Sequence, residues 1–339
     1  MEEDFLTLGI ESSCDETSAA VVKNGKEVLS NIISSQVDWH RKFGGVVPEI
    51  ASRKHVELIN PVLDEALEEA GVNFADLSAV AVTFGPGLVG GLLVAISAAK
   101  SIAYAQDIPL IAVNHIEGHI YANFISHPEL EPPVICLTVS GGHTDLLYFE
   151  ELGEYEIIGR TKDDAAGEAF DKVARVMGAG FPGGPAIDRL AKEGNPEAVE
   201  LPRPLINQGY DFSFSGLKTA VLNYINNTKQ RGEEVPKADL AASFQQAVVD
   251  VLVTKVVSAA KDKGVNNILL SGGVAANSQL RKELEEELAQ NNKQLYYPET
   301  RICTDNAAMI ASAGYFNWQQ NKEQASYSLN AEPNLQLGK

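Results

Sequence analysis

The first 25 residues alternate short apolar blocks with polar turns. Phe5-Leu-Thr-Leu-Gly-Ile10 predicts a buried strand, Glu11–Thr17 a polar turn, and Ser18–Lys23 a second strand. Asn24-Gly25 then has the composition of a tight hairpin turn, because both residues tolerate positive φ. The pattern therefore predicts antiparallel strands at the start of the chain.

The same pattern returns at residues 134–153. Val134–Val139 and Asp145–Glu150 predict two strands, joined by the polar turn Ser140–Thr144 and followed by a turn at Glu151-Leu-Gly153. Hairpins are common, so two of them prove little alone. Their similar lengths and hydroxyl-rich turns favour an internal duplication.

Helical periodicity and short apolar runs alternate through the rest of the chain, which predicts an α/β fold with helices on the faces of mixed or parallel sheets. The best candidate for a linker is His127–Pro133. The predicted helices are Val56–Ala70, Leu92–Tyr104, Ala165–Met177, Ile187–Glu193, Phe214–Asn226, Ala238–Asp262, Ala276–Gln290 and Asn306–Trp318, and the further strands are Leu77–Thr83, Pro109–Val113 and Asn267–Leu270.

Composition narrows the functional classes. The 339 residues carry a formal net charge of −19, which argues against a protein that binds nucleic acid unaided. The densest basic cluster, His40–Lys42 with Arg53–His55, fits a phosphate-binding patch or a solvated helix face equally well. The acidic N-terminus, three scattered cysteines and the lack of an 18-residue apolar run lead us to expect a cytoplasmic protein with no membrane role.

The sharpest local signal is His115-Ile-Glu-Gly-His119, which follows a predicted strand with Asn114 placed to cap a helix. Imidazoles four residues apart project from one helix face and can share a metal ion. Gly118 costs helix stability, which indicates that something packs closely there. The glutamate stands third rather than second, so the metalloprotease motif is not met. Two solvated histidines are the alternative.

Two paired-glycine loops follow predicted strands. Ser140-Gly141-Gly142 offers backbone N–H groups suited to phosphate oxygens, with His143 at its edge. Ser271–Asn277 leads into a helix, whose N-terminus favours an anion, and Asn277 could bond a ribose or phosphate. Plain turns would have the same composition. The acidic turn at Asp15-Glu16 adds to the case for a bound nucleotide.

Other polar residues are ambiguous from the sequence alone. Asp171 and Asp188 flank a glycine-rich loop and fit either ribose binding or the surface of amphipathic helices. Asp305 precedes the last helix, where an N-cap is the simpler interpretation. The Asp211–Lys218 stretch alternates aromatic residues with serine, and its pattern predicts no chemistry.

Taken together, six motifs resemble one family, TsaD, the bacterial branch of the universal tRNA threonylcarbamoyladenosine synthases. The resemblance spans about residues 5–320. The motifs are Gly9–Thr17, Gly44–Glu49, His115–His119, Val139–His143, Gly167–Lys172 and Ser271–Asn277.

The resemblance implies a two-lobed actin/Hsp70/sugar-kinase-like (ASKHA) α/β fold with duplicated lobes and a nucleotide cleft between them. The lobes would be residues 1–128, joined by a C-terminal helix at about 305–325, and residues 129–304, with a tail at 326–339. His115, His119 and Asp305 would hold one divalent metal, Fe²⁺ or Zn²⁺. Substrate-binding positions would be Thr138, Val139, Ser140, Gly141, Gly142, Asp171, Gly184, Asp188 and Asn277.

The implied reaction transfers threonylcarbamoyl from threonylcarbamoyl-AMP to N6 of adenosine 37 in tRNAs that read ANN codons. Asp15 and Glu16 would be base or positioning groups, and His143 would stabilise an oxyanion or help remove the N6 proton. The implied partners are a TsaB-like paralogue and a TsaE-like P-loop ATPase, which would explain how so acidic a chain meets tRNA.

Three other functions fit parts of the pattern. An ATPase or kinase of the same fold would use the glycine loops for ATP, but Mg-ATP sites use carboxylates and water rather than an imidazole pair. A metalloprotease is disfavoured by the glutamate position. A non-enzymatic scaffold would tolerate loss of His115.

Overall fold

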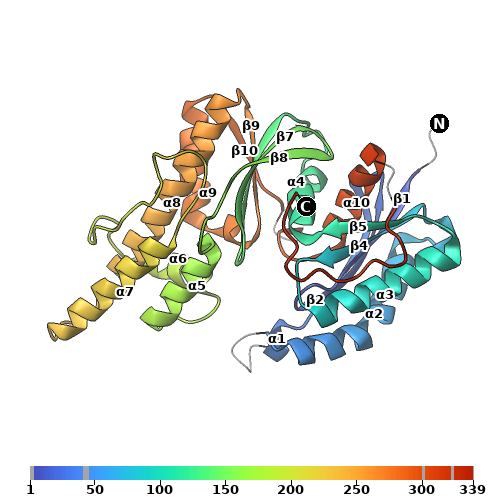
Figure 1. Cartoon of the computed structure of the whole chain (residues 1–339), viewed down its shortest axis with the longest axis horizontal. Coiled ribbons are helices and arrows are strands. Elements are labelled where there is room, and N and C mark those ends of the chain that lie inside the picture. The colour runs from blue at the N-terminus through green and yellow to red at the C-terminus, as the bar shows by residue number, and fades with distance from the viewer. Residues whose placement is uncertain (1–3, 41–45, 300–301, 322–323, 339) are drawn as a thin grey trace. The chain divides into compact units, whose positions relative to one another are not determined.

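The structure is a computed structural model that describes residues 4–40, 46–299, 302–321 and 324–338. The chain divides into two compact units (Figure 1). Unit 1 comprises Met1–Glu131, Glu151–Glu154 and Pro298–Lys339, and unit 2 comprises Pro132–Glu150 and Tyr155–Tyr297. The first boundary lies in the predicted linker, and the last one lies a few residues before the predicted 304/305 boundary.

Unit 1 is built on a five-stranded sheet of order β3-β2-β1-β4-β5, in which β1–β3 are antiparallel and β4 and β5 run parallel to β1. Its strands are β1 Leu6–Glu11, β2 Glu16–Lys23, β3 Glu27–Ser35, β4 Ala79–Gly85 and β5 Leu110–Asn114. Its helices are α1 Val37–His40, α2 Pro48–Ala70, η2 Phe74–Asp76, α3 Val89–Gln106, α4 His115–Ser126 and α10 Ala307–Asn321.

Strand alternation explains why helices cover both faces of this sheet. Ala19 and Val21 of β2 pack in the cluster that contains α2 and α3, whereas Ala20 and Val22 pack against α10. Successive strand residues point to opposite faces, so an unbroken apolar run must be buried on both. Figure 1 shows α2 and α3 on one face and α4 and α10 on the other.

Unit 2 repeats this topology. Its sheet has the order β10-β9-β6-β7-β8, and β6, β7, β8, β9 and β10 occupy the places of β1 to β5 in unit 1. The predicted duplication is thereby confirmed. The strands are β6 Val134–Val139, β7 Thr144–Glu151, β8 Glu154–Arg160, β9 Asn267–Ser271 and β10 Gln294–Tyr296.

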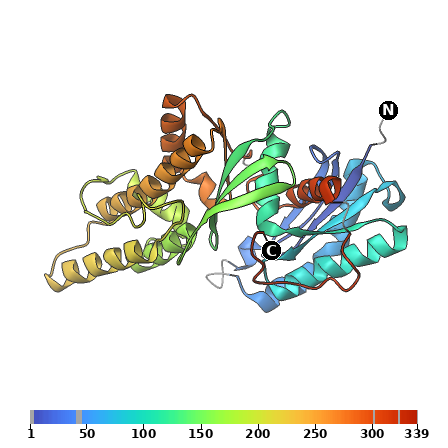
Figure 2. The same cartoon turned by 45° about the horizontal axis from the view of Figure 1, so that its top comes forward.

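The helices of unit 2 lie on one another and on its sheet (Figure 2). Their buried apolar side chains form one large cluster with residues of the sheet. These helices are α5 Ala166–Met177, α6 Gly183–Ala191, α7 Ser215–Gln230, α8 Lys237–Asp262, η3 Gly273–Ala276 and α9 Ser278–Gln290. The Asp211–Lys218 stretch, which predicted no chemistry, has a structural role at the start of α7. The Asp163 carboxylate accepts hydrogen bonds from the N–H of Phe214 and the hydroxyl of Ser213, as a capping residue does.

Two helices, α3 and α8, are long and apolar enough by composition to cross a membrane, which the sequence expectation overlooked. In α8, 78% of the most apolar window is buried within the protein. α3 packs against β4 and α2 along one side. Both helices therefore pack as the covering helices of a sheet do.

The segment predicted as a tail, 326–339, packs against unit 1 over its described residues. Glu332 N donates to Phe84 O at 2.7 Å, and Gly87 N donates to Pro333 O at 3.2 Å. Leu335 and Leu337 are buried. Two buried leucines in a polar stretch help to anchor this segment. So few apolar residues form no periodic pattern, and the sequence therefore did not predict that the segment packs.

Candidate metal centre and ligand cavity

The imidazole pair lies on α4, which begins directly at the end of β5. Asn114 caps this helix as predicted, because its side chain accepts a hydrogen bond from Ile116 N at 2.9 Å. His115 and His119 then lie one turn apart with ring centroids separated by 4.8 Å. Both side chains are largely buried, so the helix holds two nitrogen ligands in a place shielded from water.

Asp305 reaches the same point from the far end of the chain. Its Oδ1 lies 3.4 Å from Nε2 of His115 and 3.1 Å from Nε2 of His119. Ligand atoms from the three residues lie within 4.8 Å of one another. Two imidazole nitrogens and a carboxylate oxygen form a set that suits zinc or ferrous iron, so the predicted metal residues converge and fit the group.

The capping interpretation of Asp305 was wrong. The next residue, Asn306, accepts a hydrogen bond from Met309 N at 3.1 Å and so caps α10. The carboxylate of Asp305 is left to face the imidazoles.

Gly118 has the close neighbour that its place in a helix indicated. A Cβ at Gly118 would lie 2.7 Å from Cδ1 of Ile310 on α10. The missing side chain leaves room for α10 beside α4, and Asp305 lies two residues before α10. The close neighbour is the tip of a side chain, so Gly118 eases the packing of α10 on α4.

Electrostatics couple the three groups to a fourth, Glu11. Burial alone would lower the pKa of His115, but the carboxylates of Asp305 and Glu11 outweigh it and hold that pKa well above its usual value. Burial likewise opposes ionisation of Asp305, yet the adjacent imidazoles hold the pKa of Asp305 well below its usual range. The centre thus keeps its carboxylates ionised, and a cation that binds there must displace a proton from His115.

The other predicted groups in unit 1 follow β1: Asp15 lies in the turn after this strand, and Glu16 is the first residue of β2. Burial, reinforced by the neighbouring Asp15 carboxyl, raises the pKa of Glu16 to about 9. Glu16 also accepts a hydrogen bond from the Ser35 hydroxyl at 3.0 Å. A carboxyl that stays protonated at neutral pH donates a hydrogen bond rather than removing a proton, so of the two predicted roles Glu16 fits positioning better than general base.

A cavity of about 510 Å³ lies in unit 2, where five of the predicted substrate-binding residues meet. This volume is in the range of small-molecule sites. The predicted residues that line it are Gly141, Asp171, Gly184, Asp188 and Asn277. Arg189 and Lys192 add positive charge, and Phe170 adds an aromatic wall.

Several of these side chains already have protein partners. Asp171 accepts a hydrogen bond from Gly183 N at 2.7 Å, and Asp188 accepts one from the Ser278 hydroxyl at 2.8 Å. Asn277 caps α9 through Leu280 N and donates to Gln245 Oε1. These contacts fix the carboxylates and the amide in place at the cavity wall.

The loop at 140–143 has an open backbone. A Cβ at Gly141 or Gly142 would meet no described atom within 4 Å. Ser140 N donates to His143 O, and His143 N donates to the Ser140 hydroxyl, which closes the turn. The loop is therefore held in shape while its glycines leave open space beside the backbone, and its role as a phosphate nest stays a prediction.

Thr138 and Val139 do not line this cavity. Both are fully buried in β6, and the Thr138 hydroxyl lies 2.9 Å from that of Ser271 on β9. Strand alternation carries their side chains into the sheet's two packed faces. Any contact that they make with a substrate is limited to the backbone.

The basic cluster predicted near residue 40 is only partly a surface feature. His40 and His55 are buried, and Nδ1 of His55 lies 2.8 Å from the Thr17 hydroxyl. Lys54 pairs with Glu57 at 2.6 Å. Arg41, Lys42 and the glycines of the motif Gly44–Glu49 lie outside the described residues.

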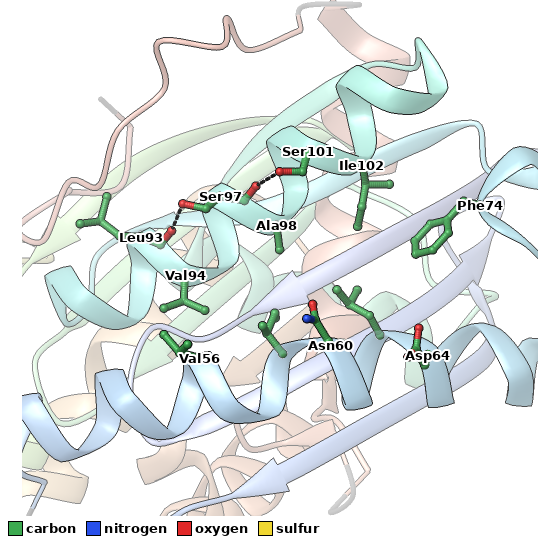
Figure 3. A pocket seen from close by; sticks show the side chains of 12 residues that line it. Val56, Asn60, Asp64, Phe74, Leu93, Val94, Ser97, Ala98, Ser101 and Ile102 are labelled. Atoms are coloured by element: carbon green, nitrogen blue, oxygen red, sulfur yellow. Dashed lines mark hydrogen bonds between the residues drawn. The ribbon is translucent and has the colours of Figure 1, made fainter.

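A larger groove, of about 780 Å³, runs between α2 and α3 (Figure 3). Its serines bond back to their own helix, since Ser97 donates to Leu93 O and Ser101 to Ser97 O. None of the predicted site residues lines it. Size alone does not make it the candidate site, because eight of its twelve lining residues are apolar.

Comparison with solved structures finds proteins of the same fold. Component A of the (R)-2-hydroxyglutaryl-CoA dehydratase of Acidaminococcus fermentans matches 94% of this chain and 100% of its own length, with a TM-score of 0.54 and 15% identity. HypF from T. kodakarensis matches 93% of this chain and 48% of its own length, with a TM-score of 0.64 and 16% identity. At such low identity these likenesses establish the fold, which is of the predicted ASKHA type.

Close relatives carry the functional comparison. A Clostridioides difficile protein named tRNA N6-adenosine threonylcarbamoyltransferase is 58% identical over 98% of this chain and 99% of its own. A Clostridium perfringens protein of the same name is 59% identical over 98% of both chains. The model of the family described as TsaD, tRNA N6-adenosine threonylcarbamoyltransferase, matches residues 27–312. The chain therefore belongs to the TsaD family.

Proposed function

We propose that this protein is a tRNA N6-adenosine threonylcarbamoyltransferase, which modifies adenosine 37 of tRNAs that read ANN codons. The observation that carries the proposal is identity of 56–59% over nearly the whole chain to proteins of that name. The ATPase or kinase alternative is not favoured, because the candidate metal centre is built on an imidazole pair.

The donor that suits this site is threonylcarbamoyl-AMP, a mixed anhydride whose AMP is a good leaving group. The cavity in unit 2 has the size for a nucleotide and carries both positive side chains and fixed carboxylates. Arg189 and Lys192 would attract the phosphate, and Asp171 and Asp188 would accept hydrogen bonds from ribose hydroxyls. The amide groups of Gly141 and Gly142 would bond phosphate or acyl oxygens.

His115, His119 and Asp305 would hold one divalent cation, Fe²⁺ or Zn²⁺. When bound, such a cation supplies Lewis-acid polarisation of phosphate and acyl oxygens. Protonated Glu16 would donate a hydrogen bond that orients a substrate oxygen, and Asp15 remains a candidate to receive the N6 proton. His143, at the edge of the nest, would steady the developing oxyanion.

We further propose that the chain works in the cytoplasm with a TsaB-like paralogue and a TsaE-like P-loop ATPase. The net charge of −19 supports the need for a partner at the tRNA surface.

The decisive test supplies threonylcarbamoyl-AMP, unmodified tRNA and the two partners, and looks for the modified nucleoside by mass spectrometry. We expect product with the unaltered chain and a loss of about 100-fold or more with Asp305→Ala, since a metal ligand is removed. Lys263→Ala, which alters an ion pair with Glu156 at the surface, is the control and should keep full activity. Absence of product with the unaltered chain, or full activity of Asp305→Ala, would contradict the proposal.

A further inference from the structure

A buried glutamate, Glu11, contacts the candidate metal centre from the side opposite Asp305. It is the last residue of β1 and is fully buried. Its Oε2 lies 3.0 Å from Nδ1 of His115, whose Nε2 faces Asp305. The two nitrogens of one imidazole ring are thus each paired with a different carboxylate.

The rest of the Glu11 carboxylate is held by the protein. Ser13 N donates to Oε1, and the Thr83 hydroxyl donates to Oε2. Ser13 also places its hydroxyl 3.1 Å from Nδ1 of His115. A buried charge is tolerated only when it is paired and hydrogen-bonded, and every one of these partners favours the ionised form of Glu11.

An ionised carboxylate can only accept hydrogen bonds. Nδ1 of His115 must therefore carry the proton, which leaves the lone pair of a neutral ring on Nε2, the nitrogen that faces Asp305 and His119. Carboxylate partners of this kind fix the tautomer and orientation of metal-bound histidines and raise their basicity.

We infer that Glu11 is a positioning residue for the metal centre, which acts through His115 and does not itself touch substrate. The inference rests on the metal site of the proposed function and assigns a role to Glu11, which lies in the motif Gly9–Thr17 but was given no role from the sequence. β1 thereby contributes to the centre from its last residue, just before the turn that leads through Asp15 to β2.

Helix α4, which carries His115 and His119, supplies a matched control for Glu11. Glu117, between the two histidines in sequence, is also buried, but it accepts a hydrogen bond from the amide of Asn317 on α10 and bonds no imidazole among the described residues. Glu11→Gln and Glu117→Gln make the same chemical change at two buried glutamates near one centre. Only the first removes the charge that holds Nδ1.

The test measures zinc affinity of the full-length protein by competition with a chromophoric chelator, with no substrate present. We expect one zinc per chain in the unaltered protein, an affinity reduced about 10–100-fold in Glu11→Gln, and an affinity within about threefold of the unaltered value in Glu117→Gln. Equal affinity of Glu11→Gln and the unaltered chain, or equal losses in both variants, would overturn the inference.

A second measurement needs no variant. In the zinc-loaded protein, ¹⁵N shifts of the histidine rings should show His115 protonated at Nδ1 and bound through Nε2. Coordination through Nδ1, or failure of the unaltered chain to bind zinc, would also overturn the inference. If the unaltered chain binds zinc as expected but shows no transferase activity, that result would count against the proposed function alone.

Discussion

Two adjacent residues before α10 have separate roles, one as the helix cap and the other as a candidate metal ligand. Asn306 caps the helix through Met309 N, and Asp305 turns its carboxylate to the imidazole pair. A cap requires only an acceptor, so the neutral amide is sufficient there. A cation requires a negative charge, which the chain places one residue earlier.

The buried carboxyl of Asp145 on β7 makes folding stability depend on pH. Burial raises its pKa to about 6, and the guanidinium of Arg160, 3.9 Å away, offsets only part of this effect. An unfolded aspartate titrates near 3.9. The folded state therefore binds more protons between about pH 4 and 6, and its stability falls as pH rises through that window.

Asp145→Asn should remove this penalty. We expect the variant to be more stable than the unaltered protein by about 1–2 kcal/mol at pH 8, with the difference vanishing toward pH 4. Urea unfolding at several pH values measures it. A difference that does not vary with pH would contradict the argument.

Asp163 provides a comparison with the opposite sign. Burial slightly opposes its ionisation, but hydrogen bonds from Ser213 and Phe214 lower its pKa. Its contribution to stability is present above the ordinary aspartate pKa and is lost as pH falls. Asp163→Asn should therefore destabilise the protein at pH 8 and have less effect in acid.

At the scale of elements, the close contact between β1 and α10 places the metal centre. A Cβ at Gly9 on β1 would lie 2.2 Å from the carbonyl oxygen of Ala307, the first residue of α10. Asp305 stands two residues before that helix. The distance between the strand and the helix therefore decides whether Asp305 reaches the histidines.

Gly9→Ala should force α10 away from β1. We expect a loss of about 1–3 kcal/mol in the free energy of unfolding, typical of overpacking, together with weaker zinc binding. Gly216→Ala on α7, where the nearest atom to a new Cβ is 3.8 Å away, is the control and should be neutral or slightly stabilising. Zinc affinity unchanged by Gly9→Ala would show that the contact does not position Asp305.

Strongly periodic or continuous apolar segments were predicted well, because burial on one or both sides leaves a plain pattern. β6 and α5 have nearly the expected bounds. The strands β3, β8 and β10 were missed. β3 and β8 mix polar with apolar residues and are only partly buried, and β10 has three residues, so each depends on its neighbours in the sheet for its formation.

The site was harder to predict than the elements. The helical spacing of His115 and His119 is local, so the sequence sufficed for that pair. Asp305 was predicted as a ligand only from the family resemblance, because the sequence spacing does not show which distant residues the fold brings together. Glu11 was missed, although an acidic residue at the end of a buried apolar strand is costly without a partner and so was itself a signal. The predicted cleft between the lobes stays a prediction.

At the scale of the whole molecule, the net charge of the protein determines its long-range electrostatic interaction with tRNA. The chain has 27 basic and 46 acidic residues. A net charge of −19 repels a polyanion at long range, and the repulsion is screened by salt. Attraction is left to local basic groups and to any partner that supplies more of them.

We expect the isolated chain to bind tRNA weakly and with a steep salt dependence. If about three phosphates are contacted, affinity should fall about 10–50-fold between 50 and 200 mM salt, because each contact releases condensed counterions. Fluorescence anisotropy with a labelled tRNA across that range measures the slope. Adding the TsaB-like and TsaE-like partners should raise the affinity at 150 mM salt, where the isolated chain binds poorly. Tight binding by the isolated chain that persists at high salt would mean that it recognises tRNA by uncharged contacts and has no need of a partner's surface.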